Sequence, residues 1–306
     1  MIDLSQIPAP DVIEALEFEA LFEDRKAELI AAMPEAQRLP ITSVLALESE
    51  PLTKLVQVST YRELLLRQRV NDAARAVMLA QATGTDLDNI GATPPYRVER
   101  LVITPANNTA VPPTPAVMES DADFRNRILL NLEAYTTAGS TGSYRYHALS
   151  ASGLVLDVSA ESPTPGYVVV YVLSRPTDYS TDGTASPELI DTVRDALNKD
   201  TVRPLTDNVA VLSASIVEYT IEASLTVDRG SDPTVVLNAA IAAAQSYADS
   251  MHRLDADPSI SGIYRALHQP GVLRVALTTP AADIMLSTGQ AGYCTGVNVT
   301  IATEEE

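Results

Sequence analysis

One long amphipathic helix constrains this chain more than any other feature of its sequence. Between residues 51 and 83, apolar residues recur at spacings of four and three, in Leu66, Val70, Ala73, Val77 and Ala80. This spacing is typical of the seam of a coiled coil, and Gly84 fits a helix C-cap. At about 1.5 Å per residue, such a helix is roughly 45–50 Å long. Its seam needs a partner, which is either a helix of the same chain or a bundle shared with other chains.

The segment before this helix is also predicted to be helical. Asp11 and Glu14 form a capping-box pattern, and Pro34 ends the helix because proline lacks a backbone N–H. This first helix is acidic, whereas the second carries the four arginines Arg62, Arg67, Arg69 and Arg75. The two helices can therefore pair, and we expect residues 1–93 to form a helical, bundle-forming region.

Residues 94–118 interrupt the helical pattern. Pro94-Pro95 breaks the chain, a strand is expected at residues 98–103, and four further prolines follow among few charges. Proline-rich segments are stiff and extended. We therefore expect an extended arm over residues 94–118.

Helix and strand patterns alternate in the rest of the chain. Ser120 and Asp123 form a second capping box. In chain order we expect a helical segment at 119–152, small α+β units at 153–216 and 217–281, and a C-terminal hairpin with an acidic tail at 282–306. The fold class is therefore α+β, with long N-terminal helices, an extended arm, a helical segment and two α+β units.

The charge balance disfavours whole classes of partner. The 306 residues include 40 acidic and 21 basic side chains, for a net charge of −19. Nucleic acids and anionic membranes require a basic surface, so neither is an expected partner. Cys294 is the single cysteine, which excludes a disulfide within the chain. We expect neither a signal peptide nor a membrane-spanning segment, and hence a soluble, non-secreted protein.

No catalytic, cofactor or metal site is predicted. The run Gly292-Tyr293-Cys294-Thr295-Gly296 has the outline of a nucleophile elbow, but that motif needs a helix after it, whereas residues 297–301 favour a strand. Cys294 is more typical of a turn in a terminal hairpin. Residues 178–183 begin like a calcium loop, but Leu189 stands where that loop needs a glutamate. We therefore expect a protein that is not an enzyme.

Four segments of the chain carry a more specific signal. They are residues 80–91 (AQATGTDLDNIG) with Arg97 after them, residues 119–128 (ESDADFRNRI) continuing through 138–145 (AGSTGSYR) to Ala148, residues 162–166 (SPTPG), and residues 202–207 (VRPLTD). In these segments, and in their order, the chain resembles the baseplate assembly protein J family of contractile-tailed bacteriophages. The resemblance covers roughly residues 75–280.

The resemblance implies a structural role in a wedge of the tail baseplate, located in the virion after assembly in the host cytoplasm. The implied partners are other copies of this chain, a second baseplate wedge protein, a sheath-initiator protein and the central hub or spike. Sheath contraction is then accompanied by a conformational change. Interface candidates are Leu66, Val70, Ala73 and Val77 on the long helix, together with Arg125, Arg127 and Arg145. Guanidinium groups hold carboxylates in bidentate ion pairs, and pairing of these arginines within the chain is an equally good interpretation.

Other functions stay open at this point. The chain can be the equivalent component of a tailocin-like contractile injection particle of bacteria. It can also be a cell-wall hydrolase carried in the tail, which requires converging carboxylates or a cysteine–histidine pair in a cleft. A host-binding fibre is disfavoured, because 13 glycines and several long helices do not fit a glycine-repeat fibre.

Overall fold

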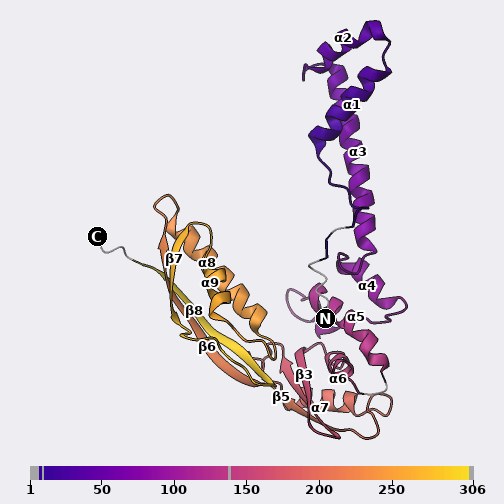
Figure 1. The fold of residues 1–306 in the computed structure, drawn as a ribbon. Coiled ribbons are helices and arrows are strands. Elements are labelled where there is room, and N and C mark those ends of the chain that lie inside the picture. Colours follow the sequence, from indigo (N-terminus) through magenta and orange to yellow (C-terminus); the bar gives the residue numbers. More distant parts are fainter. Residues whose placement is uncertain (1–6, 9, 137–138, 303–306) are drawn as a thin grey trace. The chain divides into compact units, whose positions relative to one another are not determined.

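The computed structural model describes residues 7–8, 10–136 and 139–302, and the chain divides into two compact units, residues 1–99 and 100–306 (Figure 1). The described part of the first unit is helical, and that of the second combines helices with small sheets. This confirms the predicted α+β class. Within the described ranges, none of the helices has the length and apolar character to cross a bilayer.

The first unit is built from α1 (Phe18–Ala32), α2 (Glu35–Leu45), α3 (Pro51–Ala76) and α4 (Gly84–Ala92). α1 lies along α3 (Figure 1). Ion pairs join the two segments, but the pair between the helices has the opposite sense to the predicted one, with the arginine on α1. Arg25 of α1 forms an ion pair with Glu63 of α3. Arg67 of α3 contacts Glu63 at 2.8 Å and Glu14, ahead of α1, at 3.1 Å.

Helix boundaries in this unit differ from the predicted ones. The first helix begins at Phe18 rather than at Asp11, because the side-chain amide of Asn71 holds the backbone of Glu14 ahead of the helix. The amide oxygen accepts from the N–H of Glu14 at 3.1 Å, and the amide nitrogen donates to its C=O at 2.9 Å. α3 ends at Ala76 and a turn follows, so Gly84 begins α4 instead of capping α3. α2 is a helix that the sequence pattern did not predict.

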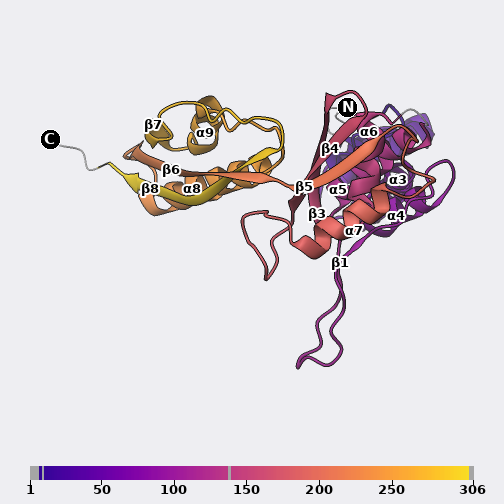
Figure 2. The same ribbon diagram turned by 90° about the horizontal axis from the view of Figure 1, so that it is seen from below.

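The proline-rich arm is a hairpin. β1 (Val102–Thr104) pairs antiparallel with β2 (Val117–Met118). Farther out, Asn107 and Thr114 exchange two backbone hydrogen bonds. Figure 2 shows the hairpin extending beyond β1 as a long loop. The segment that the prolines make extended therefore folds back on itself.

Residues 120–213 form what we call the first module. Its elements are α5 (Asp121–Leu130), η2 (Asn131–Tyr135), α6 (Thr141–Leu149), β3 (Val155–Thr164), β4 (Tyr167–Ser174), α7 (Pro187–Leu197) and β5 (Asn208–Ser213). The sheet has the order β3-β4-β5, with β4 antiparallel to β3 and parallel to β5. Ser120 and Ser186 cap α5 and α7 through their side-chain oxygens, and the sequence predicts the cap at Ser120. α6 and α7 pack against the sheet around Tyr144, Val170 and Val193.

Residues 215–301 form the second module. Its elements are β6 (Ser215–Val227), α8 (Pro233–Met251), α9 (Ile260–Leu267), β7 (Val272–Thr279) and β8 (Gln290–Ile301). The sheet has the order β7-β6-β8, with β8 parallel to β6. The predicted C-terminal hairpin at 282–306 is therefore wrong, because β8 joins the far side of β6 instead of turning back on β7. Cys294 lies within β8, opposite Tyr219, and not in a hairpin turn. The acidic tail at 303–306 lies outside the described residues.

Candidate assembly interfaces

The predicted seam of α3 is exposed. Leu66 and Val70 are 69% and 62% exposed, Ala73 is exposed as well, and Val77, directly after the helix, is 76% exposed. Leu55 is also exposed, and it precedes Leu66 by eleven residues, which is about three helical turns. α3 therefore presents a row of apolar side chains to solvent, which we call the α3 seam.

The face of α3 that packs within the chain is a different one, and its fully buried residues are polar. Its buried residues are Thr53, Thr60 and Asn71. Asn71 bonds the backbone of Glu14, and the Thr53 hydroxyl donates to the C=O of Val44 at 3.3 Å. Packing within the chain thus uses a face other than the α3 seam, with Val56 and Leu64 half-buried beside the polar residues. An exposed apolar row of this kind is typical of a surface that another chain covers.

The hairpin arm is a second exposed surface of low polarity. Residues 101–118 contain no charged side chain, although charged residues make up 20% of the chain. The side-chain oxygen of Asn107 closes the tip by accepting from the backbone N–H groups of Thr109 and Ala110. Val111 at the tip is 98% exposed. Because its prolines cannot donate to a further strand, the arm is suited to contacts made by side chains.

The three candidate arginines differ in burial and in their partners. Arg127 is 4% exposed, and its Nε and Nη2 donate to the two carboxylate oxygens of Glu119 at 3.1 and 2.7 Å. Arg145 lies 3.5 Å from Asp157, and Arg125 is partly buried on α5. Arg127 is therefore an interior residue paired within the chain, whereas an interface role for Arg125 and Arg145 stays a prediction.

A fully exposed leucine stands on a fixed loop. Leu205 is 100% exposed. Its loop is held by Asp207, whose carboxylate accepts from the hydroxyl of buried Tyr144 at 2.7 Å. Burial and this hydrogen bond raise the pKa of Tyr144. The VRPLTD segment thus builds a firm turn with an apolar tip. No pattern in the sequence predicts that this leucine is exposed, apart from its place in a segment that carries the resemblance.

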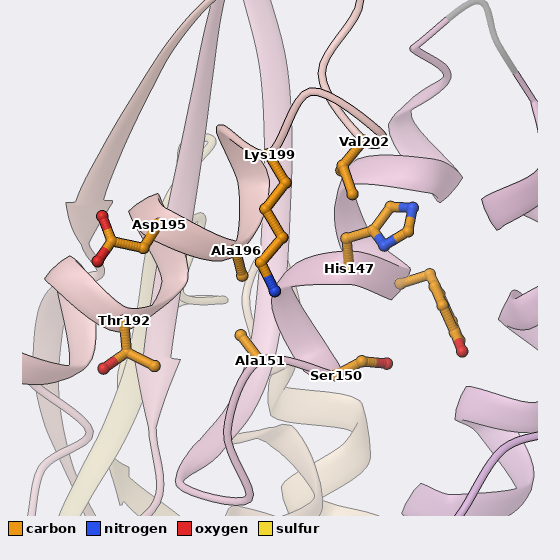
Figure 3. A pocket seen from close by; sticks show the side chains of 9 residues that line it. His147, Ser150, Ala151, Thr192, Asp195, Ala196, Lys199 and Val202 are labelled. Atoms are coloured by element: carbon orange, nitrogen blue, oxygen red, sulfur yellow. The ribbon is translucent and has the colours of Figure 1, made fainter.

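A cavity of about 530 Å³ lies between α6 and α7, lined among others by His147, Asp195 and Lys199. Figure 3 shows the Lys199 ammonium and the Asp195 carboxylate directed to different sides. Burial, helped by the charge of Lys199, lowers the pKa of His147. Both helices line the cavity with their C-terminal halves, whose carbonyl ends carry partial negative charge. That partial charge favours the position of the Lys199 ammonium group in the cavity and disfavours the binding of an anionic ligand.

Cys294 and His252 line another cavity, yet they are not arranged as a nucleophile and its base. The thiol donates to the C=O of Gly296 at 3.3 Å, and burial raises the pKa of the thiol, which disfavours a reactive thiolate. His252 bonds the C=O of Gly292 through Nδ1 at 2.8 Å. Over the part of the chain that the structure describes, no three His, Cys, Asp or Glu side chains are grouped so that they could hold a metal ion.

Comparisons with known proteins agree with the resemblance. The Baseplate J-like N-terminal domain family matches residues 48–107, and the Baseplate J-like central domain family matches residues 136–213. The chain is 50% identical to baseplate protein J of Escherichia phage P2 over 306 residues, which are 100% of this chain and 99% of that protein. A solved chain from the six-fold symmetrised cryo-EM structure of the anti-feeding prophage baseplate is similar with a TM-score of 0.43 and 13% identity, over 61% of this chain and 44% of that chain. On its identity over the full length to a baseplate protein J, this chain belongs to the baseplate J family.

Proposed function

We propose that this chain is a wedge component of a contractile phage-tail baseplate. In this role it joins further copies of itself, a second wedge protein and the sheath initiator around the central hub, and it passes on the conformational change of sheath contraction. Family membership and the full-length similarity to a phage baseplate protein support the structural role. Because that relative belongs to a phage, the similarity favours a role in a virion tail over a role in an injection particle. We propose no enzymatic step.

The α3 seam is the observation that carries the proposal. Its side chains Leu66, Val70 and Val77 are each more than half exposed, and burying one such side chain contributes about 1.5–3 kcal/mol. Their spacing is the one that helices use when they pack side by side. We infer that α3 enters a bundle with helices of neighbouring subunits.

Coexpression with the neighbouring tail proteins tests this inference. We would measure the mass of the purified complex for the wild-type chain and for a chain with both Val70→Asp and Val77→Asp. We expect a defined hetero-oligomer that the double substitution dissociates, because unpaired carboxylates in an apolar seam are strongly unfavourable. The isolated variant should keep its fold, since both positions are exposed.

Val235→Asp provides a matched control. Val235 is likewise an exposed valine, and it lies on α8. Its substitution should leave the complex intact. Two results would contradict the proposal. One is a complex that survives the double substitution in α3, and the other is a wild-type chain that stays monomeric beside every neighbouring tail protein.

A further inference from the structure

The first and second modules are joined by one short crossing of the chain. β5 ends at Ser213 and β6 begins at Ser215, so a single residue separates the two strands. Each module has its own core. A much smaller apolar cluster lies where they meet, formed by the buried residues Leu173, Ala214, Leu254 and Ala291. Two of these four are alanines, and three partly buried side chains, Leu156, Tyr171 and Ile216, pack against them. The joint therefore buries less apolar area than the core of either module.

Residues 253–255 of the second module supply polar contacts across this joint. Arg253 donates to the C=O of Leu156 at 3.1 Å and to the carboxylate of Asp123 at 3.3 Å. The N–H of Leu254 donates to Asp157 at 3.1 Å, and the carboxylate of Asp255 accepts from the hydroxyl of Ser159 at 2.5 Å. All four contacts are only partly buried. Water can therefore replace each of them when the joint opens.

Two cavities flank this segment, and each is lined by both modules. One measures about 420 Å³ and has Leu156 of the first module and Cys294 of the second in its lining. The other measures about 400 Å³ and has Arg145 of the first module and Asp255 of the second in its lining. Unfilled space therefore lies beside the joint, so a rotation of one module on the other has room to occur.

The closed joint leaves polar atoms without partners. Among the described residues, three buried side-chain polar atoms lack a hydrogen bond, and two of these, Arg145 Nε and His252 Nε2, belong to residues that line the flanking cavities. His252 already uses Nδ1 to bond Gly292, while its Nε2 lies against Gly183 of the first module. Buried polar atoms of this kind cost free energy until water reaches them. Opening the joint removes that cost.

We propose that the second module swings on the first about Ala214, and that residues 253–255 act as a latch that holds the joint closed. Only one residue of main chain crosses the joint, and the contacts that must break are the small apolar cluster and the few partly buried polar contacts of residues 253–255. Hinged motions of packed modules of this kind occur on microsecond to millisecond timescales. The inference concerns the isolated chain, so it stands or falls independently of the proposed assembly role.

The single cysteine of the chain reports on this opening. Cys294 lines the 420 Å³ cavity and is partly buried, so we would measure how fast 5,5′-dithiobis(2-nitrobenzoate) modifies it in the full chain. Arg253→Met removes both latch contacts of that side chain. We expect modification to be about tenfold faster in this variant, as for the loss of a typical charged hydrogen bond.

Arg194→Met is the matched control for this measurement. It makes the same change at an exposed ion pair with Asp191 on α7, away from the joint, and should leave the rate unchanged. Because global unfolding also exposes the thiol, the guanidinium midpoint is measured for every variant. The proposal is overturned if Arg253→Met leaves the rate unchanged, or raises it only in proportion to lost global stability.

A second variant and a second measurement guard against a misfolded Arg253→Met chain. Ser159→Ala removes the 2.5 Å bond to Asp255 from the opposite side of the joint and should also speed modification. Spin labels at Asp195→Cys and Ser246→Cys in a Cys294→Ser chain place one probe on each module. We expect a broader distance distribution with Arg253→Met than with Arg194→Met. Identical narrow distributions would overturn the proposal.

Discussion

Buried charges in the second unit are stable because each has a partner of opposite charge. Burial alone raises the pKa of the Asp123 carboxyl, but the hydrogen bond from Arg175 and the charges of Arg175 and Arg253 outweigh it, so the pKa lies below its usual value. Glu119 and Arg127 form a more deeply buried ion pair, with 2.7 Å between the guanidinium and the carboxylate. The sequence could not rank Arg125, Arg127 and Arg145, since only the fold determines which guanidinium group becomes buried.

Removing one partner of the buried pair should be costly. Arg127→Met leaves Glu119 charged and buried, so we expect the free energy of unfolding to fall by about 3–5 kcal/mol. Urea unfolding followed by circular dichroism measures it. Arg194→Met, at an exposed pair, should change it by less than about 0.5 kcal/mol. Equal small effects for the two variants would mean that Glu119 and Arg127 are solvated.

The bond between Tyr144 and Asp207 should make the chain sensitive to alkali. Because the pKa of Tyr144 is raised in the folded state, the unfolded chain releases this proton first as the pH rises above about 10. Stability is therefore lost with increasing pH in that range. Tyr144→Phe should cost about 1 kcal/mol near neutral pH and make the alkaline loss less steep. Urea unfolding at pH 8 and pH 10.5 tests both effects, and an unchanged alkaline slope would contradict the argument.

At the scale of single elements, local signals in the sequence mark where helices begin. Features that depend on contacts between distant residues could not be predicted. α7 and α8 begin at Pro187 and Pro233, each directly after a capping residue, and a capping residue followed by proline is a local start signal. The start of α1 was missed because Asn71, far along the chain, binds the segment ahead of it. β8 was missed as a partner of β6 because strand pairing across some seventy residues has no local signature.

The hairpin arm should contribute little to the stability of the isolated chain. It has no core of its own, and a lone two-stranded hairpin is marginal in water. Replacing residues 105–116 by Asn-Gly joins Thr104 to its cross-strand partner Val117 through a favoured two-residue turn. We expect the free energy of unfolding to change by less than about 1 kcal/mol while assembly with the tail proteins weakens. A large loss of stability would show that the arm packs on its own chain.

The two units bury very different amounts of apolar surface. In the described part of the first unit, the buried apolar side chains are Phe22, Leu45, Ala82, Leu87 and Val98. The second unit has cores of thirteen and twelve such residues. Ordering each residue costs about 1–2 kcal/mol of backbone entropy, which burial has to offset. Helices gain most of their stability from packing an apolar face, and the apolar face of α3 is exposed.

We therefore expect the isolated chain to unfold in two steps. Urea should first remove the helical signal of residues 1–99, and a second transition should coincide with that of a fragment containing residues 100–306. Hydrogen exchange read by mass spectrometry should show α3 exchanging before β6. In the assembled complex, binding should slow exchange in α3 according to the concentration and affinity of its partners. A single transition in the full chain would mean that the first unit is already stable without partners, and the α3 seam would then no longer indicate a missing bundle.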